Sequence, residues 1–142
     1  MKRTLKSSVA LLLALIFVFA LVSCNNVEKT GVWENATYRE DTEFGKGAKT
    51  VSVEVKAEEQ SVIFTIKTDE NTVGAALIEH ELISGEEGPF GLYIKVVNGI
   101  TADYDVDKSY WAFYIDGEYA MSGVDTTEIT EGTKYQLAYV KE

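Results

Sequence analysis

The stretch TVSVEVKAEEQSVIFTI, residues 50–66, decides the fold. Apolar residues alternate with polar ones from Val51 to Ala57, and the alternation resumes from Val62 to Ile66 after a short polar break. A period of two residues is typical of a strand with one buried face. Two such strands joined by a short polar segment predict a β-hairpin.

A helix is predicted directly after this hairpin. Asp69, Asn71 and Thr72 are candidate N-caps, and apolar residues between Val73 and Ile83 fall near one helical face. Gly85 lies where a helix commonly ends.

Three or four further strands are predicted beyond the helix, two of them followed by the tight-turn pairs Asn98-Gly99 and Asp116-Gly117. The expected strands are residues 90–96, 111–115, 118–121 and 135–139. A hairpin, one helix and then more strands predict an α+β domain, in which one helix packs across an antiparallel or mixed sheet in a β-grasp-like order. Its predicted core includes Val53, Phe64, Leu77, Leu92, Ile94, Phe113 and Leu137.

The N-terminus has the pattern of a bacterial lipoprotein signal. Basic residues at positions 2, 3 and 6 precede an uncharged run over residues 9–22, which closes in Leu21-Val22-Ser23-Cys24. That run has the length of a signal-peptide core and is short for a membrane span. We therefore expect residues 1–23 to be a signal peptide and Cys24, the only cysteine, to carry a lipid. The alternative is an ordinary secretory signal with a stray thiol.

The expected mature chain is strongly acidic. Removal of residues 1–23 leaves 119 residues and takes away three of the 13 basic residues but none of the 23 acidic ones, for a net charge of −13. This charge disfavours binding to nucleic acid or to an anionic leaflet. The membrane link is then the lipid on Cys24 alone, on the extracytoplasmic face. Residues 24–48 are interpreted as a flexible tether and residues 49–142 as a single domain. Trp33 and Tyr38 of the tether could form a short strand, contact the domain or be exposed to solvent, and these alternatives stay open.

No motif indicates an enzyme, a cofactor or a metal centre. His80 is the only histidine, so it has no second nitrogen ligand for zinc, and no nucleophile elbow supports a catalytic triad. Asp103, Asp105 and Asp107 have the spacing of a calcium loop, but Lys108 replaces the required glycine and Tyr114 the final glutamate. An irregular calcium site and a solvated loop are both open, and we favour the loop.

Aromatic residues concentrate in the strand predicted over residues 111–115. Alternation sends Trp111 and Phe113 to one sheet face and Tyr110 and Tyr114 to the other. One pair should pack beneath the helix, and the other would be free to bind a flat ligand or a carbohydrate. The alternative is that both pairs are structural.

The same segment carries a resemblance to a known family. The motifs are Gly91-Leu92-Tyr93-Ile94, Tyr110-Trp111, Asp116-Gly117, Met121-Ser122-Gly123-Val124 and residues 132–139. Over residues 49–142 the chain resembles the transcobalamin-like C-terminal domain, the smaller domain of vertebrate cobalamin carriers, which also occurs in bacterial surface proteins and lipoproteins. The resemblance implies a ligand-facing surface at Tyr110, Trp111, Phe113, Met121 and Gly123. The helical-barrel domain that completes the carriers' site has no counterpart here, which implies an open site or a partner protein that supplies the second half.

The sequence thus favours a non-enzymatic, lipid-anchored extracytoplasmic protein that captures a small ligand, with a cobalamin-like corrinoid as the candidate. The alternative is a surface module that contacts a protein or a glycan and has no small-molecule ligand.

Overall fold

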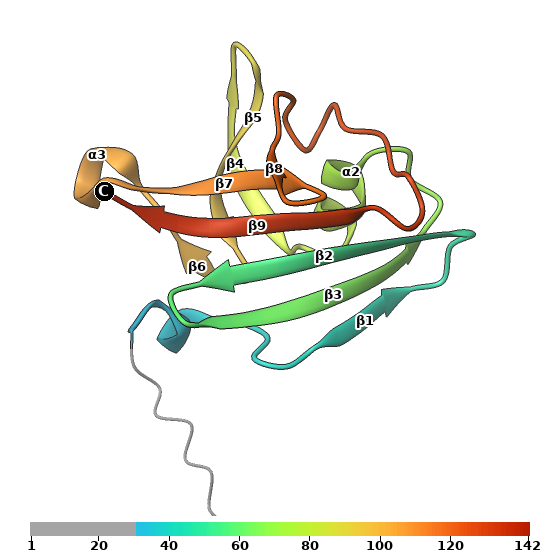
Figure 1. The fold of residues 1–142 in the computed structure, drawn as a ribbon, viewed down its shortest axis with the longest axis horizontal. Helices are drawn as coiled ribbons and strands as arrows, with labels where there is room; N and C mark the ends of the chain where they lie inside the picture. Colours follow the sequence, from blue (N-terminus) through green and yellow to red (C-terminus); the bar gives the residue numbers. More distant parts are fainter. Residues whose placement is uncertain (1–30) are drawn as a thin grey trace, which may run out of the picture.

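The computed structural model describes residues 31–142, and the predicted signal peptide and Cys24 lie outside this range. The described residues form two sheets and three short helical segments (Figure 1). The large sheet has the strand order β1 (Thr42–Gly45), β3 (Gln60–Thr68), β2 (Lys49–Ala57), β9 (Lys134–Lys141), β7 (Ser109–Ile115) and β8 (Glu118–Tyr119). The small sheet has the order β4 (Ile83–Gly88), β5 (Gly91–Val97) and β6 (Ile100–Thr101). The helical segments are η2 (Gly31–Asn35), α2 (Val73–Glu79) and α3 (Tyr104–Asp107).

The predicted hairpin of residues 50–66 is confirmed as the centre of the large sheet. β2 and β3 pair antiparallel over their whole length, from Ala57 and Gln60 at the turn to Lys49 and Thr68. β9 runs parallel to β2, and β1 runs parallel to β3, so the sheet is mixed. None of the helices formed by residues 31–142 has the length and apolar character needed to cross a membrane.

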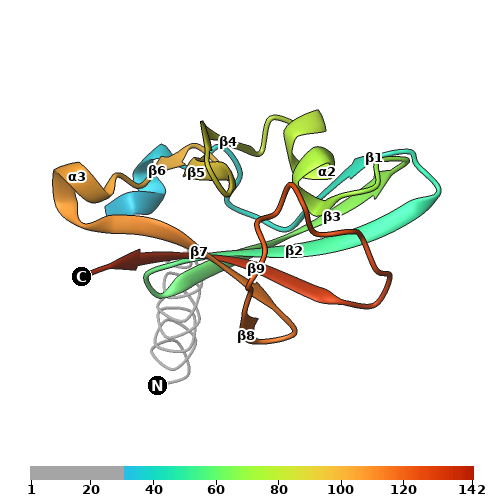
Figure 2. The same cartoon turned by 90° about the horizontal axis from the view of Figure 1, so that it is seen from above.

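A second layer covers one face of the large sheet, which we call the inner face. Figure 2 shows α2, the small sheet and η2 along this same side. No element of residues 31–142 covers the outer face, apart from the curled end of the β7–β8 hairpin. The expected arrangement of one helix across a sheet is therefore only partly right, because the helix shares the inner face with a second sheet.

Helix α2 is shorter than the sequence predicts. It begins at the N-cap Thr72, whose hydroxyl accepts a hydrogen bond from the Ala75 amide at 3.2 Å. It ends at the C-cap His80, and the Leu82 amide then donates to the Leu77 carbonyl at 2.9 Å as the chain turns into β4. The assignment of Gly85 as a helix stop is wrong. It lies in β4 at a register shift, where an added Cβ would lie 1.9 Å from the Tyr93 carbonyl oxygen.

Residues 31–48 are part of the folded domain, where the sequence predicted a flexible tether. Trp33 of η2 is 3% exposed and donates its indole N–H to the Ala57 carbonyl at 2.8 Å. Tyr38 packs edge-on against Phe44 of β1 and Phe64 of β3, with ring centroids 5.2 and 5.8 Å away. For residues 31–48 the tether prediction is wrong, because two aromatic side chains bring this segment onto the sheet through contacts distant in sequence.

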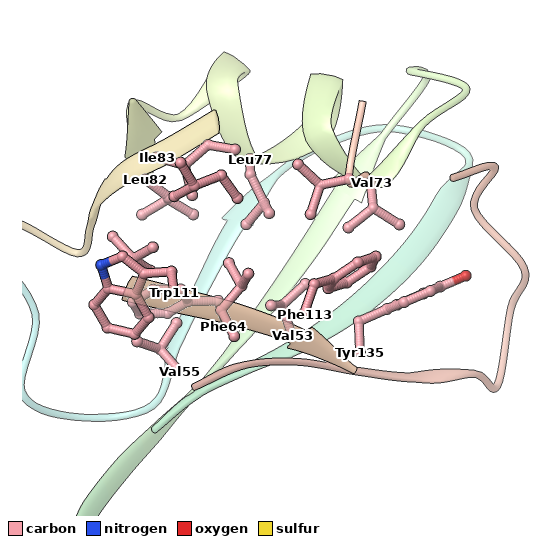
Figure 3. Packing of buried hydrophobic residues seen from close by; sticks show 14 of the residues in the cluster. Val53, Val55, Phe64, Val73, Leu77, Leu82, Ile83, Trp111, Phe113 and Tyr135 are labelled. Atoms are coloured by element: carbon pink, nitrogen blue, oxygen red, sulfur yellow. The ribbon is translucent and has the colours of Figure 1, made fainter. Parts of the chain in front are cut away.

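The core lies between the large sheet and its cover (Figure 3). Of the seven predicted core residues, six are confirmed as buried: Val53, Phe64, Leu77, Ile94, Phe113 and Leu137. Leu92 is only partly buried and packs at the margin of this cluster. That margin opens onto a groove.

Candidate functional site

The groove lies beside strand β7 and has a volume of about 360 Å³. Its walls come from three segments: β5 supplies Leu92 and Ile94, β7 supplies residues 110, 111 and 113, and the chain after β8 supplies residues 120 and 122–124. Tyr93, Tyr104 and Tyr119 complete the lining. The lining is aromatic and contains no charged side chain, and the volume lies within the range of small-molecule pockets. We call this hollow the edge groove.

The edge groove lies beyond the edge of the sheet instead of on one of its faces. Successive residues of a strand point to opposite faces. Trp111 and Phe113 belong to the inner face with the core, whereas Tyr110 belongs to the outer face, yet all three line the groove. Only a hollow beside the strand's edge can be reached from both faces.

The groove exists because β8 is very short. β8 pairs with β7 only at Tyr114 and Ile115, and the Ala120 amide then donates to the Phe113 carbonyl at 2.9 Å before the chain departs. Towards Ser109, no strand of the described residues pairs with β7 on the side opposite β9. The edge groove occupies the place where a longer β8 would have continued.

Trp111 and Phe113 have mainly structural surroundings. Each is 8% exposed, and the Trp111 indole N–H donates to the Ile100 carbonyl at 3.3 Å. Phe113 stacks on Tyr135 with ring centroids 6.1 Å apart and an interplanar angle of 15°. Of the two aromatic pairs on this strand, Trp111 and Phe113 are therefore the pair that packs beneath the cover, and only a small part of either ring is available to a ligand.

Tyrosines form the accessible part of the lining. Tyr110 is half-buried, with its ring 6.4 Å from that of Tyr104. The Tyr104 hydroxyl donates to a Glu142 carboxylate oxygen at 2.9 Å, and this hydrogen bond raises the pKa of Tyr104 above its ordinary value. The ammonium of Lys108 lies 4.6 Å from the centre of the Tyr104 ring. Tyr104 is thus held in place at the groove, although the sequence prediction did not include it.

The loop after β8 holds the last two predicted site residues. Gly123 lines the groove, but its carbonyl already accepts a hydrogen bond from the Thr127 hydroxyl at 2.7 Å. Met121 is 98% exposed and is not part of the lining. Asp125 links this loop to β5, because one of its carboxylate oxygens accepts a hydrogen bond from the Leu92 amide at 3.2 Å. Four of the five predicted binding residues therefore meet at the edge groove, and Met121 lies outside it.

The acidic triplet belongs to the one-turn helix α3, where the sequence favoured a solvated loop. Asp103 is the N-cap of α3, and its side chain accepts from the Asp105 amide at 3.0 Å. Asp107 accepts from the Ser109 hydroxyl and lies 3.3 Å from the Lys141 ammonium. The Ser109 hydroxyl is the main reason that the pKa of Asp107 is lowered. Across residues 31–142, no three histidine, cysteine or acidic side chains are grouped to hold a metal ion.

Two other features are less suited to a ligand. A hollow of about 380 Å³ on the outer face is lined by polar residues such as Ser52. Two of its polar groups already pair, since the Gln136 amide donates to the Glu54 carboxylate at 2.7 Å. His80 ends α2 and packs against the Phe44 ring, with centroids 5.3 Å apart. It lines none of the hollows described here, which agrees with a structural role at the edge of the core.

Solved structures share this fold, among them the following two. A protein from Ruminococcus gnavus ATCC 29149, provisionally described as a metal binding protein, has 28% sequence identity and a TM-score of 0.62. The likeness covers 66% of this chain and 98% of that one. Haptocorrin in complex with Cbi has 17% identity and a TM-score of 0.53 over 68% of this chain and 26% of haptocorrin. At that identity the haptocorrin likeness shows the fold alone, and it agrees with the transcobalamin-like resemblance.

Among curated proteins, none matches this chain. One protein family does, over residues 70–141, which include the edge groove. The matched segment is half of the chain, so the protein belongs to the family described as a domain of unknown function, DUF4430.

Proposed function

We propose that this protein is a non-enzymatic, lipid-anchored domain that captures a small flat ligand in the edge groove outside the cytoplasm. The observation that carries the proposal is the uncharged, tyrosine-rich lining at the free edge of β7. Aromatic side chains there can cover an apolar ligand surface, while unpaired main-chain groups of the strand can hydrogen-bond its amides.

A cobalamin-like corrinoid is the candidate ligand. It is flat and carries amide groups, and haptocorrin, whose fold is similar, was solved with Cbi bound. The groove of about 360 Å³ would hold only one margin of such a ligand and leave the rest in water. We therefore expect micromolar affinity, about −8 kcal/mol, instead of the tightest class of binding.

A partner protein could cover the exposed side of the ligand. Phe90, at the tip of the β4–β5 hairpin, is 94% exposed, and Met121 on the neighbouring loop is 98% exposed. These chain segments are adjacent, since a Cβ added to Gly123 would lie 3.9 Å from the Phe90 carbonyl oxygen. Two exposed apolar side chains beside the groove suit burial against a second protein surface.

The proposed anchor also orients the groove. Seven residue steps separate Cys24 from Gly31, a reach of at most about 25 Å. Figure 1 places η2 at the lower edge of the domain and the tip of the β4–β5 hairpin at the upper edge. A lipid on Cys24 would therefore hold the η2 side near the membrane and leave the groove accessible. Cys24→Ala should move the protein from the membrane fraction to the soluble one; retention in the membrane fraction would contradict the anchor.

Ligand capture is tested by titrating the unlipidated chain of residues 25–142, which contains the whole described fold, with cobalamin. Quenching of tryptophan fluorescence should saturate in the micromolar range, and calorimetry checks that the change is not optical absorption by the ligand. A panel of glycans serves as the comparison. Lack of heat and quenching with cobalamin at millimolar concentration would reject the corrinoid, and a glycan signal would favour the surface-module alternative.

A further inference from the structure

We infer that the edge groove also accepts an extended, positively charged peptide, which pairs with β7 as an additional strand. This inference does not depend on the corrinoid proposal, although both occupants would use the same groove. It rests on the main chain of β7, on the two-sided lining of the groove and on the charge around it.

The main chain of β7 has a vacant pairing position opposite Trp111. In an antiparallel ladder, residues two apart turn their N–H and C=O groups toward the same neighbouring strand. The Phe113 carbonyl faces away from β9, because it accepts from the Ala120 amide. Trp111 is two residues earlier, so its N–H and C=O face the same side, where β8 no longer runs. An extended peptide placed there would satisfy both groups.

The walls of the groove suit the alternating side chains of an extended peptide. On the inner side, Leu92 and Ile94 of β5 offer apolar contact. On the outer side, Tyr110 and Tyr119 present aromatic rings, on which an ammonium or guanidinium group can lie. A strand added between these walls would direct alternate side chains to each of them.

The two edges of the large sheet are protected to different degrees. Natural proteins guard exposed strand edges with charges, prolines or very short strands. β1 is such a guarded edge, since it has four residues, includes Glu43 and follows Asp41, whose carboxylate accepts from the Ile63 amide at 2.7 Å. The free part of β7, residues 109–112, contains neither a charge nor a proline. An unguarded edge in an otherwise guarded sheet is consistent with use as a pairing site.

The acidic residues around the free edge of β7 favour a positively charged peptide. The chain has 23 acidic and 13 basic residues, and the exposed carboxylates of Asp105 and Glu118 lie on elements at the two ends of the free edge. Of the basic residues near that edge, Lys141 is paired with Asp107, and Lys108 lies over the Tyr104 ring, so the carboxylates outnumber the lysines there. A cationic peptide is therefore attracted to this edge and an acidic one is repelled.

The test uses the unlipidated chain of residues 25–142 and a capped hexapeptide of alternating lysine and valine. Backbone amide signals are followed by NMR during the titration. The Trp111 amide should shift and exchange with solvent at least tenfold more slowly, whereas the Tyr114 amide, which faces β9, should not respond. The matched control is the same peptide N-methylated at every residue, which keeps the side chains and charge but donates no main-chain hydrogen bond. Its affinity should be at least tenfold lower, and a glutamate–valine peptide should also bind at least tenfold more weakly.

Equal binding of the N-methylated peptide, or an unchanged Trp111 amide at millimolar peptide, would overturn the inference. Protection of Trp111 that rises with protein concentration in the absence of peptide would identify a second copy as the occupant and would also overturn it. Cobalamin binding measured in parallel separates the two proposals, because either ligand can fail while the other binds.

Discussion

The centre of the large sheet and the free edge of β7 are built from the same kinds of residue, yet they differ in what surrounds them. At the centre, Val53, Phe64 and Leu137 lie on strands that are paired on both sides, and all three are fully buried. At the edge, β8 pairs with β7 only at Tyr114 and Ile115, so the earlier residues of β7 have no neighbouring strand on that side. Tyr110, one of these residues, is only half-buried. The early end of β8, more than the composition of β7, turns an aromatic strand into one wall of a groove.

The largest expected effect concerns the centre. Phe64→Ala should lower the free energy of unfolding by about 3–5 kcal/mol, because it removes a buried ring that contacts Tyr38 and Phe44 and leaves a cavity. Chemical denaturation of residues 25–142 measures the change. Thr65→Ala, on the outer face of the same strand, is the control and should cost less than about 1 kcal/mol. A similar loss of stability for both variants would contradict the account, because the buried face of the central strand would then contribute no more than its outer face.

A smaller loss is expected where η2 joins the centre. Trp33→Phe keeps an aromatic ring but removes the donor to the Ala57 carbonyl, which would remain buried without its partner. The free energy of unfolding should fall by about 1–3 kcal/mol. An unchanged denaturation curve would restore the flexible-tether interpretation of residues 31–48.

At the edge, stability should respond little. Tyr110→Ala removes a half-exposed ring from the outer face and should lower the free energy of unfolding by less than about 1 kcal/mol. Thermal and chemical denaturation of the Tyr110→Ala and Phe64→Ala variants, measured side by side, compare the two losses of stability. A loss as large as that of Phe64→Ala would mean that the tyrosines of the groove are part of the core.

The smallest effect is a local titration beside the edge. The Ser109 hydroxyl lowers the pKa of Asp107, so this carboxylate favours the folded state above its unfolded pKa and loses that contribution as pH falls through the folded pKa. Ser109→Ala should raise the pKa of Asp107 toward its ordinary value, as measured by NMR of the side-chain carboxyl carbon. An Asp107 pKa that does not move in this variant would assign the lowering to Lys141 instead.

Much of the large sheet could be predicted because its strands carry a strong local pattern. Val51 to Ala57, Val62 to Ile66 and Trp111 to Ile115 alternate clearly, and Asp116-Gly117 marks a tight turn. β1 and η2 were missed because no alternation marks residues 31–48. Both are attached by contacts distant in sequence, η2 through the Trp33 hydrogen bond to Ala57 and β1 through its pairing with β3. β4 was missed because Ile83 lies near the apolar face of the predicted helix, whereas the chain leaves that helix after His80.

The site could be predicted only in part, for a related reason. Tyr110 and Gly123 were predicted and do line the edge groove, but Tyr104 and Leu92 were not, since neither adjoins the aromatic strand in sequence. The hollow itself depends on where β8 ends. The residues 118–121 were predicted to return along β7, and the structure stops that strand at Tyr119. The alternation of apolar and polar residues does not indicate that a strand ends two residues earlier than predicted.

The most direct test of the central claim is a comparison of two tyrosine variants in cobalamin binding. Tyr110 lines the edge groove, while Tyr114 lies on the same strand and the same sheet face but outside the lining. Calorimetric titration should show that Tyr110→Ala weakens binding at least tenfold, about 1.4 kcal/mol, whereas Tyr114→Ala stays within about twofold of the parent protein. Equal losses in the two folded variants, or no loss in either, would contradict the assignment of the edge groove as the ligand site.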